Sequence, residues 1–177
     1  MISIEKRPDI KMNPIFERTS VRIFEKREVE TEKTDAILRA GMAAPSGGNQ
    51  CPWEFFVVRD PDTIERLSKS SPYAGAAGRA GVVIVPCFRT QELIYPELVY
   101  MDMSACVENM LLEITALGLG GVWLSIAPYE DRMKNVDTIL GIGDELRSFA
   151  LIPVGYPSNK RSAKDRYDEG RVHTDGL

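Results

Sequence analysis

The chain has 177 residues, and its 22 Lys and Arg against 26 Asp and Glu leave a net charge of −4. That length favours a single domain over residues 1–177, and the acidic balance argues against a surface built for nucleic acid. No apolar run approaches the roughly 18 residues of a membrane helix, and the charged N-terminus lacks the apolar stretch of a signal peptide. We therefore expect a cytoplasmic protein with no membrane partner.

Cysteine and histidine are too few and too scattered for most catalytic or metal-binding sets. The three cysteines, Cys51, Cys87 and Cys106, are an odd number with no CxxC spacing, and the single histidine, His173, lies near the C-terminal end. These residues fit neither a disulfide framework nor a zinc or iron–sulfur ligand set, and they argue against a serine–histidine or cysteine–histidine relay. We expect no metal site, and we expect a bound organic cofactor to supply any difficult chemistry.

Nine segments carry secondary-structure signals. Asn13–Pro14 and Asp60–Pro61 each pair an N-cap residue with a proline at the first helical position. The predicted helices cover residues 14–17, 30–41, 60–69, 97–117 and 130–140. Apolar, β-branched runs predict strands over residues 53–58, 81–86, 121–125 and 148–155. This alternation predicts an α/β or α+β fold with one sheet and helices around it, followed by a polar tail from residue 157.

The predicted helix over 97–117 is apolar on most of its circumference. Its first apolar stripe consists of Val99, Met103, Cys106, Met110, Ile114 and Leu117. A second stripe beside it consists of Leu98, Met101, Ala105, Leu112 and Ala116. Such a helix is buried on all sides. It lies either at the centre of one core or across a dimer interface, where the second stripe meets a partner chain.

The segment Glu17–Phe24 (ERTSVRIF) concentrates groups that bind anions. Arg18 and Arg22 are four residues apart, with the Ser20 hydroxyl between them. Guanidinium groups match the geometry of phosphate, and each charge-assisted hydrogen bond contributes about 1.5–3 kcal/mol. The alternative is a salt-bridged surface, because Glu17, Glu25 and Glu28 are close in sequence.

Residues 44–52 (APSGGNQCP) form a predicted loop through which backbone can approach a flat ligand. Gly47 and Gly48 have no Cβ atom, and Ser46 and Asn49 offer hydrogen-bonding side chains. The alternative is a tight turn before the next strand. Residues 118–121 (GLGG) follow a helix and lack the third glycine of a dinucleotide fingerprint, and no P-loop motif is present.

The tail after Pro157 is rich in cations. They are Lys160, Arg161, Lys164, Arg166 and Arg171. The tail is either a solvated end, a weak nucleic-acid patch, or a segment that returns Lys164 and Arg166 to the anion site of Arg18 and Arg22. One aromatic residue and interleaved acidic residues argue against nucleic acid.

Four blocks in this order resemble the FMN-dependent nitroreductase family. They are RTSVR (18–22), APSGGNQCPW (44–53), DMSACVENMLLEITALGLGGVWL (102–124) and LGIGDEL…ALIPVGYP followed by KDRYDEGRVH. The resemblance extends from about Asn13 to His173. It implies an α+β fold, a nitroreductase-like FMN-binding α/β sandwich with a central mixed sheet flanked by helices. It further implies a homodimer with FMN at the subunit interface.

The resemblance also implies which residues hold the cofactor. The phosphate would contact Arg18, Ser20 and Arg22, with Thr19 between them, and the tail residues Lys164 and Arg166. The ribityl chain and the isoalloxazine ring would contact Pro45, Ser46 and Asn49, and the ring would face the backbone of Leu124, Ser125 and Ile126. No protein side chain is expected to be catalytic, because the flavin N5 does the chemistry.

The implied activity is that of an FMN-dependent NAD(P)H oxidoreductase with a ping-pong cycle. NADH or NADPH passes a hydride to the flavin N5, and a nitroaromatic, quinone or enone then accepts it. Cys51 stands where the family commonly has glutamine, and Ser125 where it often has glycine, which bears on the choice of substrate. Three alternatives stay open: a flavin-dependent dehalogenase, a non-catalytic protein that stores or senses FMN, and a small acidic interaction protein whose basic tail docks an anionic partner.

Overall fold

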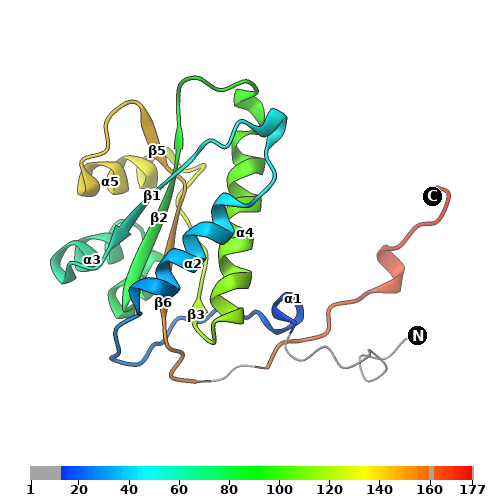
Figure 1. Cartoon of the computed structure of the whole chain (residues 1–177), viewed down its shortest axis with the longest axis horizontal. Coiled ribbons are helices and arrows are strands. Elements are labelled where there is room, and N and C mark those ends of the chain that lie inside the picture. The colour runs from blue at the N-terminus through cyan, green and yellow to red at the C-terminus, as the bar shows by residue number, and fades with distance from the viewer. Residues whose placement is uncertain (1–12, 160–161, 177) are drawn as a thin grey trace.

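A computed structural model describes residues 13–159 and 162–176. Six short strands form one sheet between two layers of helices, with α2 and α4 on one face and α3 and α5 on the other (Figure 1). The strands are β1 (Trp53–Val58), β2 (Val82–Arg89), β3 (Gly120–Gly121), β4 (Leu124–Ser125), β5 (Leu146–Ser148) and β6 (Ala150–Gly155). The α-helices are α1 (Pro14–Glu17), α2 (Thr31–Met42), α3 (Pro61–Ser68), α4 (Val99–Ala116) and α5 (Glu130–Leu140). The α+β prediction is confirmed.

The sheet is more antiparallel than expected. Its order is β1-β2-β6-β3, with β5 also paired to β2 and β4 also paired to β6. All of the strand ladders among the described residues are antiparallel. The parallel part of the predicted mixed sheet reduces to one isolated bridge between Ser20 and Gly121.

The core lies along β2 and β6, the two central strands. Residues 82–88 of β2 and all residues of β6 are buried, because both faces of these strands are covered by helices. The continuous apolar runs that predicted these strands are typical of this double coverage. Ile84, Ile152 and Leu151 are fully inaccessible to solvent.

Two predicted strands are divided in the structure. The ladders of β3 and β4 with β6 share one register, which places Val122 opposite Pro153, and a proline has no N–H to continue the ladder. The predicted strand over 148–155 divides into β5 and β6 at Phe149. There Val85 and Pro86 of β2 face three residues, 149–151, so one extra residue bulges.

The two helix starts predicted from a cap residue followed by proline are confirmed by their cap bonds. The Asn13 side chain accepts from the Ile15 N–H at 3.1 Å, and the Asp60 carboxylate accepts from the Thr63 N–H at 2.8 Å. Helix α5 ends at Gly141, whose φ of 67° is left-handed. The helix predicted over 97–117 begins as the 3-10 turn η4 (Pro96–Leu98) and continues as α4.

The two apolar stripes of α4 differ in burial. Within the first stripe, Val99, Met103, Cys106, Met110 and Ile114 are buried against the sheet and α2. The second stripe is incompletely covered: Met101 is 68% exposed, Ala116 is exposed, and Leu98, Ala105 and Leu112 are half-buried. One chain therefore covers one side of α4 and leaves the other partly open.

Two polar clusters fasten outer elements to the sheet. The Tyr156 hydroxyl donates to Glu30 at 2.7 Å and accepts from Lys33 at 2.7 Å, and the Arg27 guanidinium stacks on the Tyr156 ring. The backbone N–H of Glu30 and the Tyr156 hydroxyl are the main causes that lower the pKa of Glu30 to about 2.

On the other face, Asp137 of α5 accepts from the Ser148 N–H at 3.0 Å and from Arg147 at 3.2 Å.

Candidate functional site

The cationic segment 18–22 is held by α1 and by β3. The N–H of Arg18 closes α1 on the Pro14 carbonyl at 2.9 Å, and the N–H of Val21 donates to the Gly121 carbonyl at 3.0 Å. Gly120 permits this approach, because a Cβ atom there would lie 2.7 Å from the Val21 Cβ. The segment therefore lies against the strand that follows α4.

Arg18 and Arg22 are not neutralised by the acidic residues that are close in sequence. The Nε of Arg18 lies 3.5 Å from Glu108 of α4, and both side chains are partly exposed. Arg22 is exposed and makes no ion pair within the described part of the chain. The expected partners Glu17, Glu25 and Glu28 pair with neither arginine among the described residues. One exposed ion pair is worth about 0–1 kcal/mol, so Arg18 can exchange Glu108 for a stronger anion.

The loop over residues 44–52 lies at the opposite end of α4, over its first turn. The N–H of Gly47 donates to one oxygen of Asp102 at 2.8 Å, and the Gln50 side-chain amide donates to the other at 2.6 Å. Three of the four residues 48–51 have left-handed backbone, with φ of 55° at Gly48, 56° at Asn49 and 43° at Cys51; Gln50, with φ of −73°, does not. Glycine adopts this conformation without cost, whereas the other two residues are held in it by the surrounding bonds.

Inside this loop the predicted ligand groups have different surroundings. The Ser46 hydroxyl accepts from the Cys51 N–H at 3.0 Å, which is the bond of a tight turn. The Cys51 thiol donates to the Asn49 side chain at 3.7 Å. Pro45, Gly48 and Asn49 are exposed. The loop is thus an internally bonded turn that presents backbone and the Asn49 amide to the outside.

Of the predicted ring-facing residues 124–126, only Ser125 is exposed. Leu124 and Ile126 are buried. The Ser125 carbonyl accepts from Arg132 at 3.2 Å, and that guanidinium lies 3.9 Å from the Tyr129 ring centroid. Within one chain a ligand can therefore reach Ser125 directly, whereas Ile126 is fully inaccessible to solvent and Leu124 nearly so.

A row of aromatic rings links this segment to the first turn of α4. The ring centroids of Trp123 and Phe149 are 5.6 Å apart, those of Phe149 and Tyr100 5.9 Å, and those of Tyr100 and Phe88 5.6 Å. Trp123 directly precedes the segment, and Tyr100 lies near Asp102 on α4. Phe88 lies opposite Trp53, which follows the loop over 44–52, so the aromatic row extends from residues 124–126 to the end of that loop.

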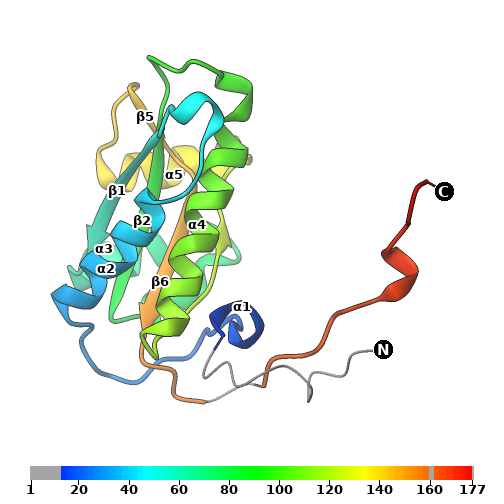
Figure 2. The same cartoon turned by 45° about the vertical axis from the view of Figure 1, so that its right-hand side comes forward.

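The structure does not bring all of the predicted residues together within one chain. From Asp102, at the loop, to Ala116, just before β3, α4 rises by about 21 Å, and the segment 18–22 and the loop lie at its two ends (Figures 1 and 2). Lys164 and Arg166 belong to the tail over 162–176, which is exposed throughout and runs away from the sheet and helices (Figure 2). Lys160 and Arg161 lie outside the described residues.

The sequence interpretation missed Asp102 and Gln50. Asp102 is 5% exposed and Gln50 7% exposed, and both are fully engaged in hydrogen bonds. A signal for Asp102 exists in the sequence. It occupies a core position of the first apolar stripe of α4, between Val99 and Cys106, where an acidic residue requires buried partners.

The cysteines divide into two inert thiols and one partly exposed thiol. Burial raises the pKa of Cys106 to about 12 and raises that of Cys87 further. Cys51 is half-buried. Within residues 13–159 and 162–176, no cluster of His, Cys, Asp and Glu is arranged to hold a metal, and none of the helices there is long and apolar enough to span a membrane.

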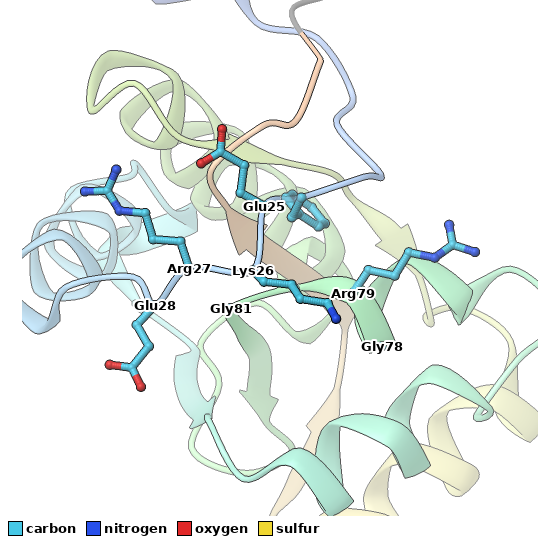
Figure 3. Close-up of a pocket in the computed structure, with 9 residues that line it drawn as sticks. Glu25, Lys26, Arg27, Glu28, Gly78, Arg79 and Gly81 are labelled. Carbon is cyan, nitrogen blue, oxygen red and sulfur yellow. The ribbon is translucent and has the colours of Figure 1, made fainter.

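A surface pocket of about 490 Å³ lies elsewhere, between residues 24–28 and 78–81. Its charges are of both signs, with Lys26 and Arg79 extending to one side and Arg27 and Glu28 to the other (Figure 3). Arg27 is already bonded to Glu30. None of the residues predicted to hold the cofactor lines this pocket.

The described chain is an α+β protein whose candidate ligand-binding segments lie at the two ends of α4. A family model described as "Nitroreductase family" matches residues 15–72 and 68–156. The chain belongs to the nitroreductase family.

Relatives span nearly the whole chain. A protein of Archaeoglobus fulgidus, provisionally named NADH dehydrogenase/NAD(P)H nitroreductase, is 36% identical over 90% of this chain and 94% of its own length. An iodotyrosine deiodinase of Thermotoga neapolitana is 29% identical over 88% of this chain and 91% of its own length.

Solved structures share the fold at similar identity. A protein of Clostridium acetobutylicum, provisionally named NADH oxidase, has a TM-score of 0.91 at 38% identity and covers 93% of this chain and 100% of its own. A protein of Desulfovibrio desulfuricans, provisionally named nitroreductase and solved in complex with FMN, has a TM-score of 0.79 at 28% identity, with coverages of 93% and 95%.

Proposed function

We propose that this protein is an FMN-dependent NAD(P)H oxidoreductase that acts as a homodimer on a small organic acceptor. The observation that carries the proposal is the cationic segment Arg18–Arg22 on the family's fold. Its two guanidinium groups and the Ser20 hydroxyl match the donor set that a phosphate monoester requires. The FMN complex of the D. desulfuricans relative supports the choice of cofactor.

The described residues fit FMN in two parts. The segment 18–22 supplies positive charge, and a phosphate near dianionic at pH 7 favours several cations. The loop presents the exposed backbone of Gly48 and the exposed Asn49 amide, beside which a flat ring can lie. Because these parts lie at the two ends of α4, we infer that one FMN contacts the cationic segment of one chain and the loop of its partner.

The open side of α4 supports this dimer. In an antiparallel pairing of two α4 helices, the first turn of one faces the last turn of the other, so a loop from one chain meets a cationic segment from its partner. The second stripe, which includes the exposed Met101, would be buried there. We infer that the exposed tail supplies Lys164 and Arg166 to the phosphate from across this interface.

When bound, FMN would supply two-electron hydride chemistry at its N5 atom, with NADH or NADPH as the donor and a small organic molecule as the acceptor. The residues of the chain position and tune the cofactor. Arg18, Ser20 and Arg22 would hold the phosphate, Asn49 and the neighbouring backbone would border the ring, and segment 124–126 would reach it through the exposed Ser125. The acceptors that fit the proposal are a nitroaromatic, a quinone or an enone.

Reductive dehalogenation is the second candidate activity. The identity with the deiodinase of T. neapolitana favours it, because the match spans most of both chains. The same cofactor and the same two-chain site would serve both activities. The two candidates therefore differ in the acceptor and not in how FMN is held.

An anaerobic visible spectrum of the purified protein, before and after NADH and separately NADPH, tests the proposal. A flavin spectrum that bleaches with either donor is the expected result, followed by turnover with nitroaromatic, quinone, enone or iodophenol acceptors. A flavin that stays oxidised would favour a storage or sensing role. A colourless protein that cannot be reconstituted with FMN would refute the proposal.

A further inference from the structure

The strongest unassigned feature of the molecule is a buried polar clamp made by Asp102, Gln50 and the backbone of Tyr95. Asp102 lies in the first turn of α4, Gln50 in the loop over 44–52, and Tyr95 in the turn before η4. Asp102 bonds to the loop, and the Gln50 amide of that loop bonds to Tyr95, so the three segments are linked through Gln50.

The orientation of the Gln50 amide is determined by Tyr95. The Gln50 carbonyl oxygen accepts from the Tyr95 N–H at 2.9 Å, and its NH₂ group donates to the Tyr95 carbonyl at 3.1 Å. This pairing resembles a two-bond link between strands. Reversing the amide would place donor against donor and acceptor against acceptor, so the NH₂ group must face Asp102.

Asp102 must therefore accept two hydrogen bonds, one on each carboxylate oxygen. One oxygen receives the Gly47 N–H at 2.8 Å and the other receives the Gln50 NH₂ at 2.6 Å. A carboxylate has acceptors only, whereas an asparagine would present its own NH₂ group to one of these donors. A buried donor left without a partner costs free energy, so position 102 requires a carboxylate and does not tolerate an amide.

The clamp joins the loop over 44–52 and the turn that carries Tyr95 into one unit. A Cβ atom at Gly48 would lie 2.8 Å from the Tyr95 ring, and one at Gly47 would lie 2.6 Å from Leu98, so the loop packs directly on the turn. Tyr95 is 43% exposed and Ile94 61% exposed beside it. The exposed rim next to Asn49 is therefore continuous with the turn that carries Tyr95.

We propose that Asp102, acting through Gln50, is a positioning residue that holds the loop over 46–51 and the turn over 94–96 as one rigid wall of the FMN site, with the exposed Tyr95 and Ile94 at its edge. This inference rests on the proposed function for its ligand. Asn49 and Cys51 have left-handed backbone, a conformation that persists only where surrounding bonds impose it. The clamp supplies such bonds to the loop.

The test compares Asp102→Asn with the matched control Asp137→Asn. Asp137 also accepts one backbone N–H and one side-chain N–H, from Ser148 and Arg147, but on the opposite face of the sheet. Amide hydrogen exchange of the FMN-free protein is measured first. We expect exchange of Gly47 and Tyr95 to rise together by at least tenfold in Asp102→Asn and to stay within twofold in Asp137→Asn.

Titration with FMN follows on the same proteins. We expect the Kd for FMN to rise at least tenfold in Asp102→Asn and less than twofold in Asp137→Asn, at matched fractions of folded protein. Faster exchange at Gly47 alone, with Tyr95 protected, would overturn the clamp, and so would equal effects of the two variants on FMN binding. If the wild-type protein binds no FMN, the proposed function fails, and the exchange pattern still decides whether Asp102 joins the two segments.

Discussion

Replacing Arg18 with alanine should weaken FMN binding strongly while changing the stability of the fold little. In the structure the only ion pair of Arg18 among the described residues joins it to Glu108 at 3.5 Å, with side chains 31% and 50% exposed. A pair of this kind contributes about 0–1 kcal/mol, so its loss should barely move the free energy of unfolding. A charge-assisted bond to phosphate is worth about 1.5–3 kcal/mol, which corresponds to a Kd about 10- to 100-fold higher.

Replacing Glu108 should change the affinity for FMN in the opposite direction. Its carboxylate lies beside the guanidinium that we assign to phosphate, so Glu108→Gln should tighten FMN binding by a few-fold as it removes a repelling charge. Fluorescence titration of FMN against the wild type, both variants and Arg66→Ala, an exposed arginine on α3, measures the two effects. Unchanged affinity in Arg18→Ala would refute the phosphate assignment, and weaker binding in Glu108→Gln would refute the electrostatic reasoning.

Three further predictions concern the fold, the assembly and the pH dependence. Gly120→Ala should destabilise the protein by about 1–3 kcal/mol, because the new Cβ would press on Val21, whereas Gly75→Ala, which meets no atom within 4 Å, should not; urea unfolding compares them. Met101→Glu should shift the dimer toward monomer and lower FMN affinity, which sedimentation and titration report; a stable FMN-loaded dimer would contradict the interface. Because the folded-state pKa of Glu30 is lowered to about 2 from 4.5, its stabilisation is complete above about pH 4.5 and is lost as the pH falls toward 2. Tyr156→Phe removes one cause of that shift, so its unfolding midpoint should depend less on pH in this window, and an unchanged slope would exclude the Tyr156 contribution.

Patterns local in the sequence predicted the elements that depend on local chemistry. The strand Trp53–Val58 and the helix Glu130–Leu140 have the predicted bounds, because aromatic and β-branched alternation and helical spacing act within a few residues. The Asn13 and Asp60 caps were likewise predictable from the sequence, since each side chain accepts from an N–H two or three residues away. The family blocks identified the residues 18–22 and 44–53 as the candidate site.

Tertiary structure decided what depends on partners distant in the chain. Val122 leaves the sheet because Pro153, about thirty residues later, has no N–H to pair with it, and the break at Phe149 depends on the bulge opposite Pro86. In the sequence Asp102 is an isolated acidic residue in an apolar helix, and only the folded chain brings its partners Gly47 and Gln50 to it. The separation of the cationic segment and the loop by the length of α4 is also absent from the sequence, because spacing along a chain carries no information on which end of a helix each segment reaches.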